Sequence, residues 1–286
     1  MGAGLFHLFV EYPVLVVVAA ALIFVAARMV LVPSDRKRCD WFLAATALAL
    51  PANMLSEGTA LLLSYLRPMK LDQYIFQLDG LFGFQASFTL GRLLAHHLWL
   101  KILCTVAYSV LPCMVLVVFG FYLWHRSQAE TLQVLRTFLF NLFLAVPIYL
   151  LAPACGPAFA FAGFPFSQPV HLVPHPIELF AAPNCIPSVH MSTALLIAWF
   201  SWRMGKGRVL SAAYLVLIVM ATLGSGQHYL VDLIIAIPYT LGIVRLGQVE
   251  WKFLRKKEAV PIYAAEAKRI RPPQDSCQAH STAANA

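Results

Sequence analysis

Two histidines and one aspartate have the residue types and the spacing that could do chemistry on a phosphate. His190 closes a Pro-Ser-Val-His stretch at the start of one apolar run, and His228 comes just before a second apolar run. Asp232 follows His228 by four residues, so a helix would place the carboxylate and the imidazole on one face. Ionisable groups beside membrane-length apolar runs are costly and tend to be functional. We therefore expect His190, His228 and Asp232 to share one site.

Phosphoryl transfer suits these three side chains. A neutral His228 could attack phosphorus with one ring nitrogen while Asp232 accepts the N–H of the other, fixes the tautomer and stabilises the developing positive charge. A phosphohistidine intermediate would divide one difficult step into two. His190 could then act as the general acid in the first step and as the general base in the second.

Residues next to the two histidines are candidates for binding the phosphate. Both histidines lie at predicted helix N-termini, where free N–H groups and the helix dipole favour an anion. Ser188 is typical of a helix start, and a glycine at position 226 would let backbone N–H groups approach a phosphate closely. Gln227 could bind phosphate or cap the turn, and the sequence leaves both alternatives open.

The composition indicates an integral membrane protein. Of 286 residues, 60% are hydrophobic and only 12% are charged, whereas a soluble domain carries about 25% charged residues. Several apolar runs are near the ~20 residues that cross a bilayer as a helix. We predict an all-α polytopic membrane bundle of about seven transmembrane spans. The predicted spans are residues 13–32, 41–66, 98–123, 132–151, 188–202, 209–224 and 229–246.

Basic residues indicate the orientation of this bundle. They gather at 36–38, 126–136, 203–208 and 252–257, and seven alternating spans put all four groups on one side. The positive-inside rule makes that side cytoplasmic and places the N-terminus and the histidines outside. The net charge of +8 is then explained by the loops, and the pattern argues against a nucleic-acid partner.

The chain divides into three predicted parts. Residues 1–130 hold the first spans and an outer amphipathic segment at 67–97, whose pattern is typical of short helices on a membrane surface. Residues 131–250 form the candidate catalytic membrane core, including an irregular outer loop rich in Pro, Gly and Phe. Residues 251–286 are polar and are expected to form a disordered cytoplasmic tail.

The stretches Cys-Ile-Pro-Ser-Val-His (185–190) and His-Tyr-Leu-Val-Asp (228–232) resemble the type 2 phosphatidic acid phosphatase superfamily. The closer resemblance is to the branch containing inositol phosphorylceramide synthase and sphingomyelin synthase, over roughly residues 152–246. It implies a six-helix phosphatase-like core, here with one extra span, and a mechanism without a metal or other cofactor. Carried over residue by residue, it implies that His228 is the nucleophile, Asp232 orients it and His190 is the acid–base partner.

The chain also departs from the phosphatase pattern. The phosphatase branch has a Lys/Arg-Pro motif before the first histidine and a Ser-Arg pair before the second, yet no Lys or Arg occurs from Thr137 to Trp202, and Ala221-Thr222 stand where Ser-Arg would fall. The usual cationic clamp on the phosphate is therefore missing, which fits the synthase-like branch better than a plain phosphatase. Other cationic groups would have to neutralise the phosphate. The candidates are Arg67, Lys70 and Arg92 in the outer segment, and His171 and His175 in the outer loop.

Two of the six cysteines lie near the ends of the irregular outer loop. If the outer side is oxidising, Cys155 and Cys185 could form a disulfide that closes this loop, or they could remain two unpaired thiols. None of the six cysteines has the spacing of a metal-ligand motif.

These features predict a membrane enzyme that transfers a phosphoryl group or phospho-headgroup, or hydrolyses a lipid phosphate, at the outer leaflet. Its substrate would be a membrane lipid, and its acceptor water, an alcohol or a polyol. The short loops are typical of a bacterial inner-membrane protein with its site on the periplasmic face. The alternatives are a seven-span transporter or receptor, which would bind without turnover, and an inactive lipid-binding relative.

Overall fold

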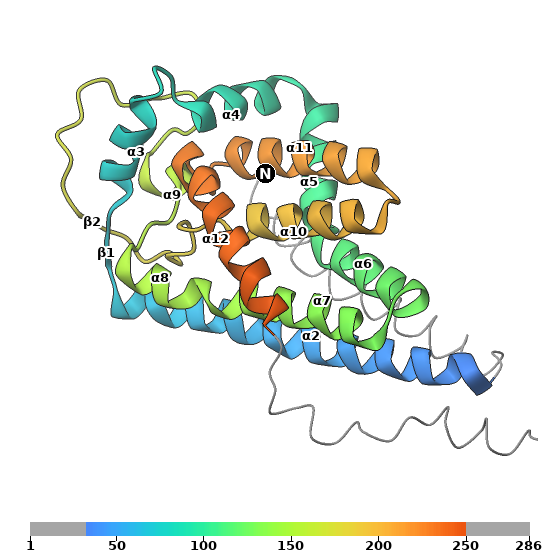
Figure 1. Ribbon diagram of the computed structural model, residues 1–286. Coiled ribbons are helices and arrows are strands. Elements are labelled where there is room, and N and C mark those ends of the chain that lie inside the picture. Colours follow the sequence, from blue (N-terminus) through green and yellow to red (C-terminus); the bar gives the residue numbers. More distant parts are fainter. Residues whose placement is uncertain (1–32, 250–286) are drawn as a thin grey trace, which may run out of the picture. The chain divides into compact units, whose positions relative to one another are not determined.

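The computed structural model describes residues 33–249, and this part of the chain is all-α apart from two strands of two residues each (Figure 1). In chain order the elements are α2 (Pro33–Leu66), β1 (Met69–Lys70), α3 (Asp72–Gly80), α4 (Ala86–His96), α5 (Leu98–Ser109), α6 (Leu111–His125), α7 (Gln128–Phe143), α8 (Ala145–Leu151), α9 (Pro157–Ala160), β2 (Ile177–Glu178), α10 (Val189–Met204), α11 (Arg208–Gly224) and α12 (Leu230–Gln248). The first predicted span and the predicted tail lie outside the described residues.

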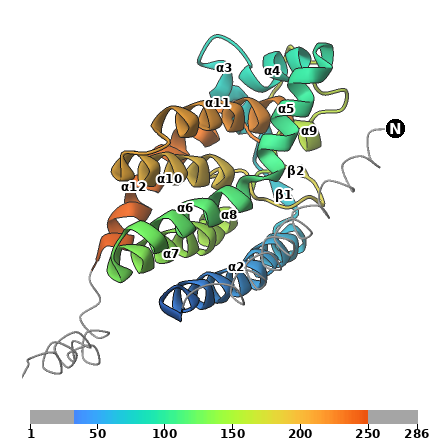
Figure 2. The same cartoon turned by 90° about the vertical axis from the view of Figure 1, so that its right-hand side faces the viewer.

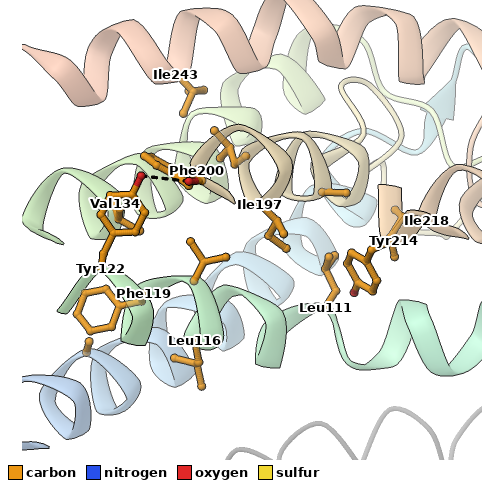
Figure 3. Close-up of a cluster of buried hydrophobic side chains, with 14 of the residues drawn as sticks. Leu111, Leu116, Phe119, Tyr122, Val134, Ile197, Phe200, Tyr214, Ile218 and Ile243 are labelled. Carbon is orange, nitrogen blue, oxygen red and sulfur yellow. Dashed lines mark hydrogen bonds between the residues drawn. The ribbon is translucent and has the colours of Figure 1, made fainter. Parts of the chain in front are cut away.

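Helix α10 occupies the centre of the packing. It contacts α6, α7, α11 and α12, and both ribbon views show it between α11 and α7, with α2 beyond α7 (Figures 1 and 2). The main apolar core lies around it and includes Val134, Ile197, Phe200 and Ile218 (Figure 3). The hydroxyl of Tyr122 donates to the Phe200 carbonyl at 3.2 Å, so this buried polar group is paired within the core.

A buried polar network joins α7 to the first turns of α10. The amide nitrogen of Asn141 donates to the Thr193 hydroxyl at 2.9 Å, and its amide oxygen accepts from the Ser192 hydroxyl at 2.5 Å. The Tyr239 hydroxyl of α12 donates to the Asn141 carbonyl at 2.6 Å. Because all these groups are satisfied, the network fixes the start of α10, where His190 lies, relative to two neighbouring helices.

Fewer membrane-length helices are found within residues 33–249 than the six spans predicted there. Within the described residues, Gln128–Leu151 and Leu230–Gln248 are long and apolar enough to cross a membrane, and the bent pair α5–α6 makes a third if it counts as one span. The fourth predicted span, which contains Pro147, is thus confirmed in length and composition, as is the seventh. Helices α10 and α11, with 16 and 17 residues, are shorter than the about 20 residues of a typical membrane-spanning helix.

The predicted span at 98–123 is formed by two helices, α5 and α6, rather than by one continuous helix. The chain bends by 51° between α5 and α6, at Val110. Pro112 stands in the first turn of α6, where its missing N–H costs nothing, whereas inside a continuous helix it would remove a backbone hydrogen bond and clash with the preceding turn. The bend therefore follows from a proline that the apolar pattern alone hides.

The outer segment at 67–97 contains the short helices predicted for it, α3 and α4. Helix α4 packs against α11, and α3 packs against α9 and α12. The contact with α11 is close, because a Cβ added at Gly224 would lie 2.4 Å from Leu94 Cδ1. Strand β1 pairs antiparallel with β2, Lys70 opposite Ile177. The outer segment thus packs against the rest of the protein near the start of α12. This packing positions the residues of the site.

Candidate active site

The structure brings the two predicted histidines together. His190 is the second residue of α10, and His228 lies just before α12. Their ring centroids are 6.0 Å apart, with an angle of 62° between the ring planes. His190 is half-buried, whereas His228 and Asp232 are buried. A phosphoryl group bonded to one ring would therefore lie within reach of the other.

A backbone carbonyl, rather than Asp232, holds the His228 ring. Nδ1 of His228 lies 3.1 Å from the carbonyl oxygen of Cys185 and 3.6 Å from Oδ2 of Asp232. The carbonyl can only accept, so Nδ1 carries the proton and donates it there, which leaves the lone pair on Nε2. Burial lowers the pKa of His228 to about 4, so the ring is neutral at pH 7. The tautomer-fixing role predicted for Asp232 thus belongs to Cys185.

Asp232 is held by other partners. Its Oδ2 accepts from the backbone N–H of Tyr229 at 2.7 Å and from the thiol of Cys185 at 2.6 Å. Its Oδ1 is buried without a hydrogen-bond partner. The carboxylate remains close enough to His228 to stabilise a positive charge on that ring through the low-dielectric interior.

Tyr108 of α5 is a site residue that the sequence analysis missed. Its ring stacks on His190, with centroids 4.3 Å apart and 23° between the planes. The Tyr108 hydroxyl donates to Oε1 of Gln227 at 2.5 Å and lies 3.2 Å from Nδ1 of His190. Since the hydroxyl proton is used on Gln227, Nδ1 of His190 is the donor to the tyrosine oxygen, and Nε2 of His190 is left for a substrate.

The first turn of α12 is already occupied by an anion. The carboxylate of Asp79, from α3, accepts the N–H groups of Leu230 and Val231, each at 2.8 Å. These are orphan donors of a helix start, which an acidic side chain satisfies from a distant part of the chain. The expectation that this helix N-terminus binds the phosphate is therefore wrong for these two N–H groups.

Ser188 and Gly226 also have structural partners. The Ser188 side chain is buried and caps α10 by accepting the N–H of Met191 at 3.3 Å, which confirms the predicted helix start. Gly226 has a φ of +73°, and its carbonyl accepts the N–H of Ala158 at 2.9 Å. A Cβ at Gly226 would lie 2.6 Å from the Phe164 ring, so glycine is needed here for packing as well as for backbone conformation.

A second acidic residue of α3, Asp72, holds the outer loop against the site. It accepts the backbone N–H groups of Cys155 at 3.1 Å and Gly156 at 2.8 Å, and the Tyr229 hydroxyl at 3.0 Å. Burial raises the pKa of Asp72 to about 6, and the N–H bonds oppose this shift. Burial likewise raises the pKa of Asp79 to about 6. Both acids lie in the predicted amphipathic segment, but nothing in their spacing indicated partners some 80 to 150 residues away.

Of the five candidate cationic groups, Lys70 and Arg92 have partners outside the site, and the other three are exposed. Lys70 is fully buried, its ammonium donates to the Arg67 carbonyl, and burial lowers its pKa. Arg67 is exposed, and Arg92 donates to the Pro165 carbonyl at 3.5 Å. His171 and His175 are exposed on the outer loop. Within residues 33–249, none of the contacts found for these five side chains is with His190 or His228.

The two cysteines of the outer loop are free thiols. Cys155 donates to the Ala181 carbonyl at 3.3 Å, and Cys185 donates to Asp232 as described above. Of the two alternatives for this pair, the structure thus has the unpaired thiols. The thiol of Cys185 instead contacts Asp232, and its carbonyl contacts His228.

Comparison with known families agrees with this geometry. The model of the PAP2 superfamily matches residues 73–246, more than half of the chain, and the protein belongs to this superfamily. Membership implies a phosphatase-like or phosphotransferase-like membrane enzyme, in agreement with the apolar helices of membrane length. No curated protein and no solved structure matches the chain.

Proposed function

We propose that this protein transfers a phospho-headgroup from a membrane lipid through a covalent His228 intermediate, in the manner of the inositol phosphorylceramide synthase-like branch. The observation that carries the proposal is the pair of rings 6.0 Å apart, with Nδ1 of His228 held by a carbonyl. That arrangement presents an unprotonated Nε2 as a nucleophile beside a second imidazole. The outer leaflet, periplasmic in a bacterial cell, is the side where the proposed reaction takes place.

The first step forms the phosphoenzyme. Nε2 of His228 attacks phosphorus, the N–P bond forms, and the bond from phosphorus to the leaving lipid oxygen breaks. His190 in its protonated form gives its Nε2 proton to that oxygen. The phosphorylated ring then carries a positive charge, and the carboxylate of Asp232, 3.6 Å from Nδ1, stabilises it.

The second step releases the group to an acceptor. Nε2 of His190, now neutral, takes the proton of an acceptor O–H, the oxygen attacks phosphorus, and the N–P electron pair returns to His228. Water as the acceptor gives hydrolysis, and an alcohol or polyol gives transfer. Tyr108 holds the His190 ring throughout, since it stacks on the ring and accepts from its Nδ1.

The charge of the site supports a phosphodiester substrate over a phosphomonoester. A monoester carries about −1.5 to −2 at pH 7, whereas a diester carries a single charge. In the part of the chain that the structure describes, the polar contacts of His190 and His228 are with Tyr108, the Cys185 carbonyl and the Asp232 carboxylate, and they include no Lys or Arg side chain. One negative charge is more easily accommodated there than two, which favours headgroup transfer over removal of a terminal phosphate.

The test uses purified wild type, His228→Ala and the control His96→Ala, in which an exposed histidine outside the site is removed. Each is incubated with a lipid extract labelled with radioactive phosphorus. We expect label to move into a new lipid or onto a soluble alcohol with wild type and the control, and not with His228→Ala. Label released only as inorganic phosphate would support a lipid phosphatase instead. No movement of label with wild type would overturn the proposal.

A further inference from the structure

Three potential metal ligands from two separate segments meet in the candidate active site, and one of them is the proposed nucleophile, His228. Sγ of Cys185, Nδ1 of His228 and a carboxylate oxygen of Asp232 all lie within 4.8 Å of one another, and all three residues are buried. We propose that this Cys185–His228–Asp232 cluster binds a thiophilic divalent cation such as Zn²⁺, and that the bound ion inhibits the enzyme. The inhibitory part of this inference rests on the proposed function of His228.

The donor set fits such an ion. A thiolate, an imidazole and a carboxylate are the three kinds of side chain that Zn²⁺ takes, and three protein ligands leave a fourth position for water. The thiolate disfavours Mg²⁺ and Ca²⁺, which prefer oxygen ligands. With one thiolate and one carboxylate, the charges of the ion and its ligands cancel, which limits the cost of a buried ion.

An unsatisfied atom points independently to a missing partner. Oδ1 of Asp232 is buried and lacks any hydrogen-bond partner, although Oδ2 of the same carboxylate has two. Buried carboxylate oxygens are normally paired, because an unpaired one has lost its hydration without compensation. A cation bound at the carboxylate would provide that compensation.

Binding requires a defined movement of protons. The Cys185 thiol loses its proton to solvent when sulfur bonds to the ion. The proton on Nδ1 of His228 leaves and Nε2 takes one up, so one proton is released for each ion bound. The Cys185 Sγ to Asp232 Oδ2 distance must also open from 2.6 Å to about 3.5 Å, the separation of a sulfur and an oxygen ligand on one tetrahedral Zn²⁺.

The change of tautomer explains inhibition. With the ion on Nδ1, Nε2 of His228 carries a proton and has no lone pair for phosphorus. Inhibition should therefore appear as a loss of phosphoenzyme formation rather than as unfolding.

Cobalt(II) provides a direct test of binding. The full-length protein in detergent, kept reduced with a phosphine, is titrated with Co²⁺, whose bond to a thiolate gives a near-ultraviolet charge-transfer band. The variants are Cys185→Ser and, as a matched control, Cys113→Ser, a half-buried cysteine of α6 outside the cluster. We expect wild type to bind one Co²⁺ per chain and to show a band that disappears when Zn²⁺ displaces the cobalt. Cys113→Ser should show the same band.

Cys185→Ser should lose the band and bind at least about 100-fold more weakly, since even loss of an outer partner of a metal ligand costs about 10–100-fold. An unchanged band in that variant, or no saturable binding to wild type, overturns the site. If the variant does not fold, release of one proton per Zn²⁺ from wild type in weak buffer provides the same test, and no release overturns the site.

Zn²⁺ should also stop labelled-lipid turnover by wild type. Binding without any turnover would count against the proposed function, whereas turnover insensitive to Zn²⁺ would overturn the inhibitory role.

Discussion

Nδ1 of His228 donates to the backbone carbonyl of Cys185 at 3.1 Å, although the carboxylate of Asp232, four residues further on, lies only 3.6 Å from the same nitrogen. A main-chain oxygen cannot be removed by a side-chain substitution, so the ring keeps its tautomer in any variant that preserves the fold. Orientation of the ring and stabilisation of its charge are therefore assigned to different groups, which separates two roles that a single carboxylate performs in a serine-protease triad.

Asp232→Asn should therefore be less damaging than the equivalent change in such a triad. The substitution removes the charge near His228, an interaction of up to about 4 kcal/mol at this distance, while the carbonyl of Cys185 still holds the ring. We expect kcat to fall by about 100- to 1,000-fold, against about 10,000-fold where the carboxylate also fixes the tautomer. Steady-state turnover of labelled lipid measures this. Complete inactivation in a folded variant would show that Asp232 does more than stabilise charge.

Tyr108→Phe tests the second histidine. The phenylalanine keeps the stacking on His190 but removes the oxygen that accepts from Nδ1, so the ring loses its fixed orientation. We expect about a tenfold fall in kcat, below the 100- to 10,000-fold that general acid–base catalysis contributes in full. The control is Tyr122→Phe, which removes a hydroxyl paired to the Phe200 carbonyl in the core. An equal fall in both variants would mean that the effect is one of stability.

Asp79→Ala tests the cap on α12. It leaves the N–H groups of Leu230 and Val231 without their acceptor, and the free energy of unfolding should fall by about 2 kcal/mol. Thermal unfolding in detergent measures the change. Glu178→Ala removes an exposed carboxylate from β2 and should stay within about 0.5 kcal/mol of wild type. Equal stability of Asp79→Ala and wild type would exclude this capping role.

The pH dependence of the nucleophile follows from its burial. The pKa of His228 is lowered from the usual 6.5 to about 4, so the ring becomes protonated, and loses its lone pair, only below about pH 4. In chelator-treated protein with ¹⁵N-labelled histidine, the signal that His228→Asn removes should keep the neutral chemical shift from pH 7 down to pH 5. A midpoint near 6.5 would show that the ring is solvated.

The sequence predicts the reacting groups better than it predicts what holds them. His190, His228 and Asp232 stand out because ionisable residues are rare beside apolar runs, and Ser188 because helix starts have a local signature. Tyr108 and Asp79 act through contacts more than 100 residues away in the chain, and no local pattern encodes such a distance. The partner of His228 was missed for another reason: a backbone carbonyl has no residue type to recognise.

In the helix bundle, too, some features can be predicted from the sequence and others cannot. Apolar length alone identifies 132–151 and 229–246 as membrane-length helices, and both are found. It cannot show that α5 and α6 diverge by 51°, because apolar length takes no account of Pro112 in the first turn of α6. The cluster of Cys185, His228 and Asp232 is likewise invisible in the spacing of the cysteines, since its ligands come from two segments that only the fold brings together.

The most direct test of the account is to trap the covalent intermediate. Wild type, His190→Ala and His228→Ala are mixed with phosphorus-labelled lipid, quenched in alkali, and digested to locate the label. A phosphohistidine survives alkali and is lost in acid. We predict alkali-stable label on His228 in wild type, an equal or greater amount in His190→Ala because release also needs the general base, and none in His228→Ala. Label on another residue, or turnover that persists without His228, would contradict the central claim.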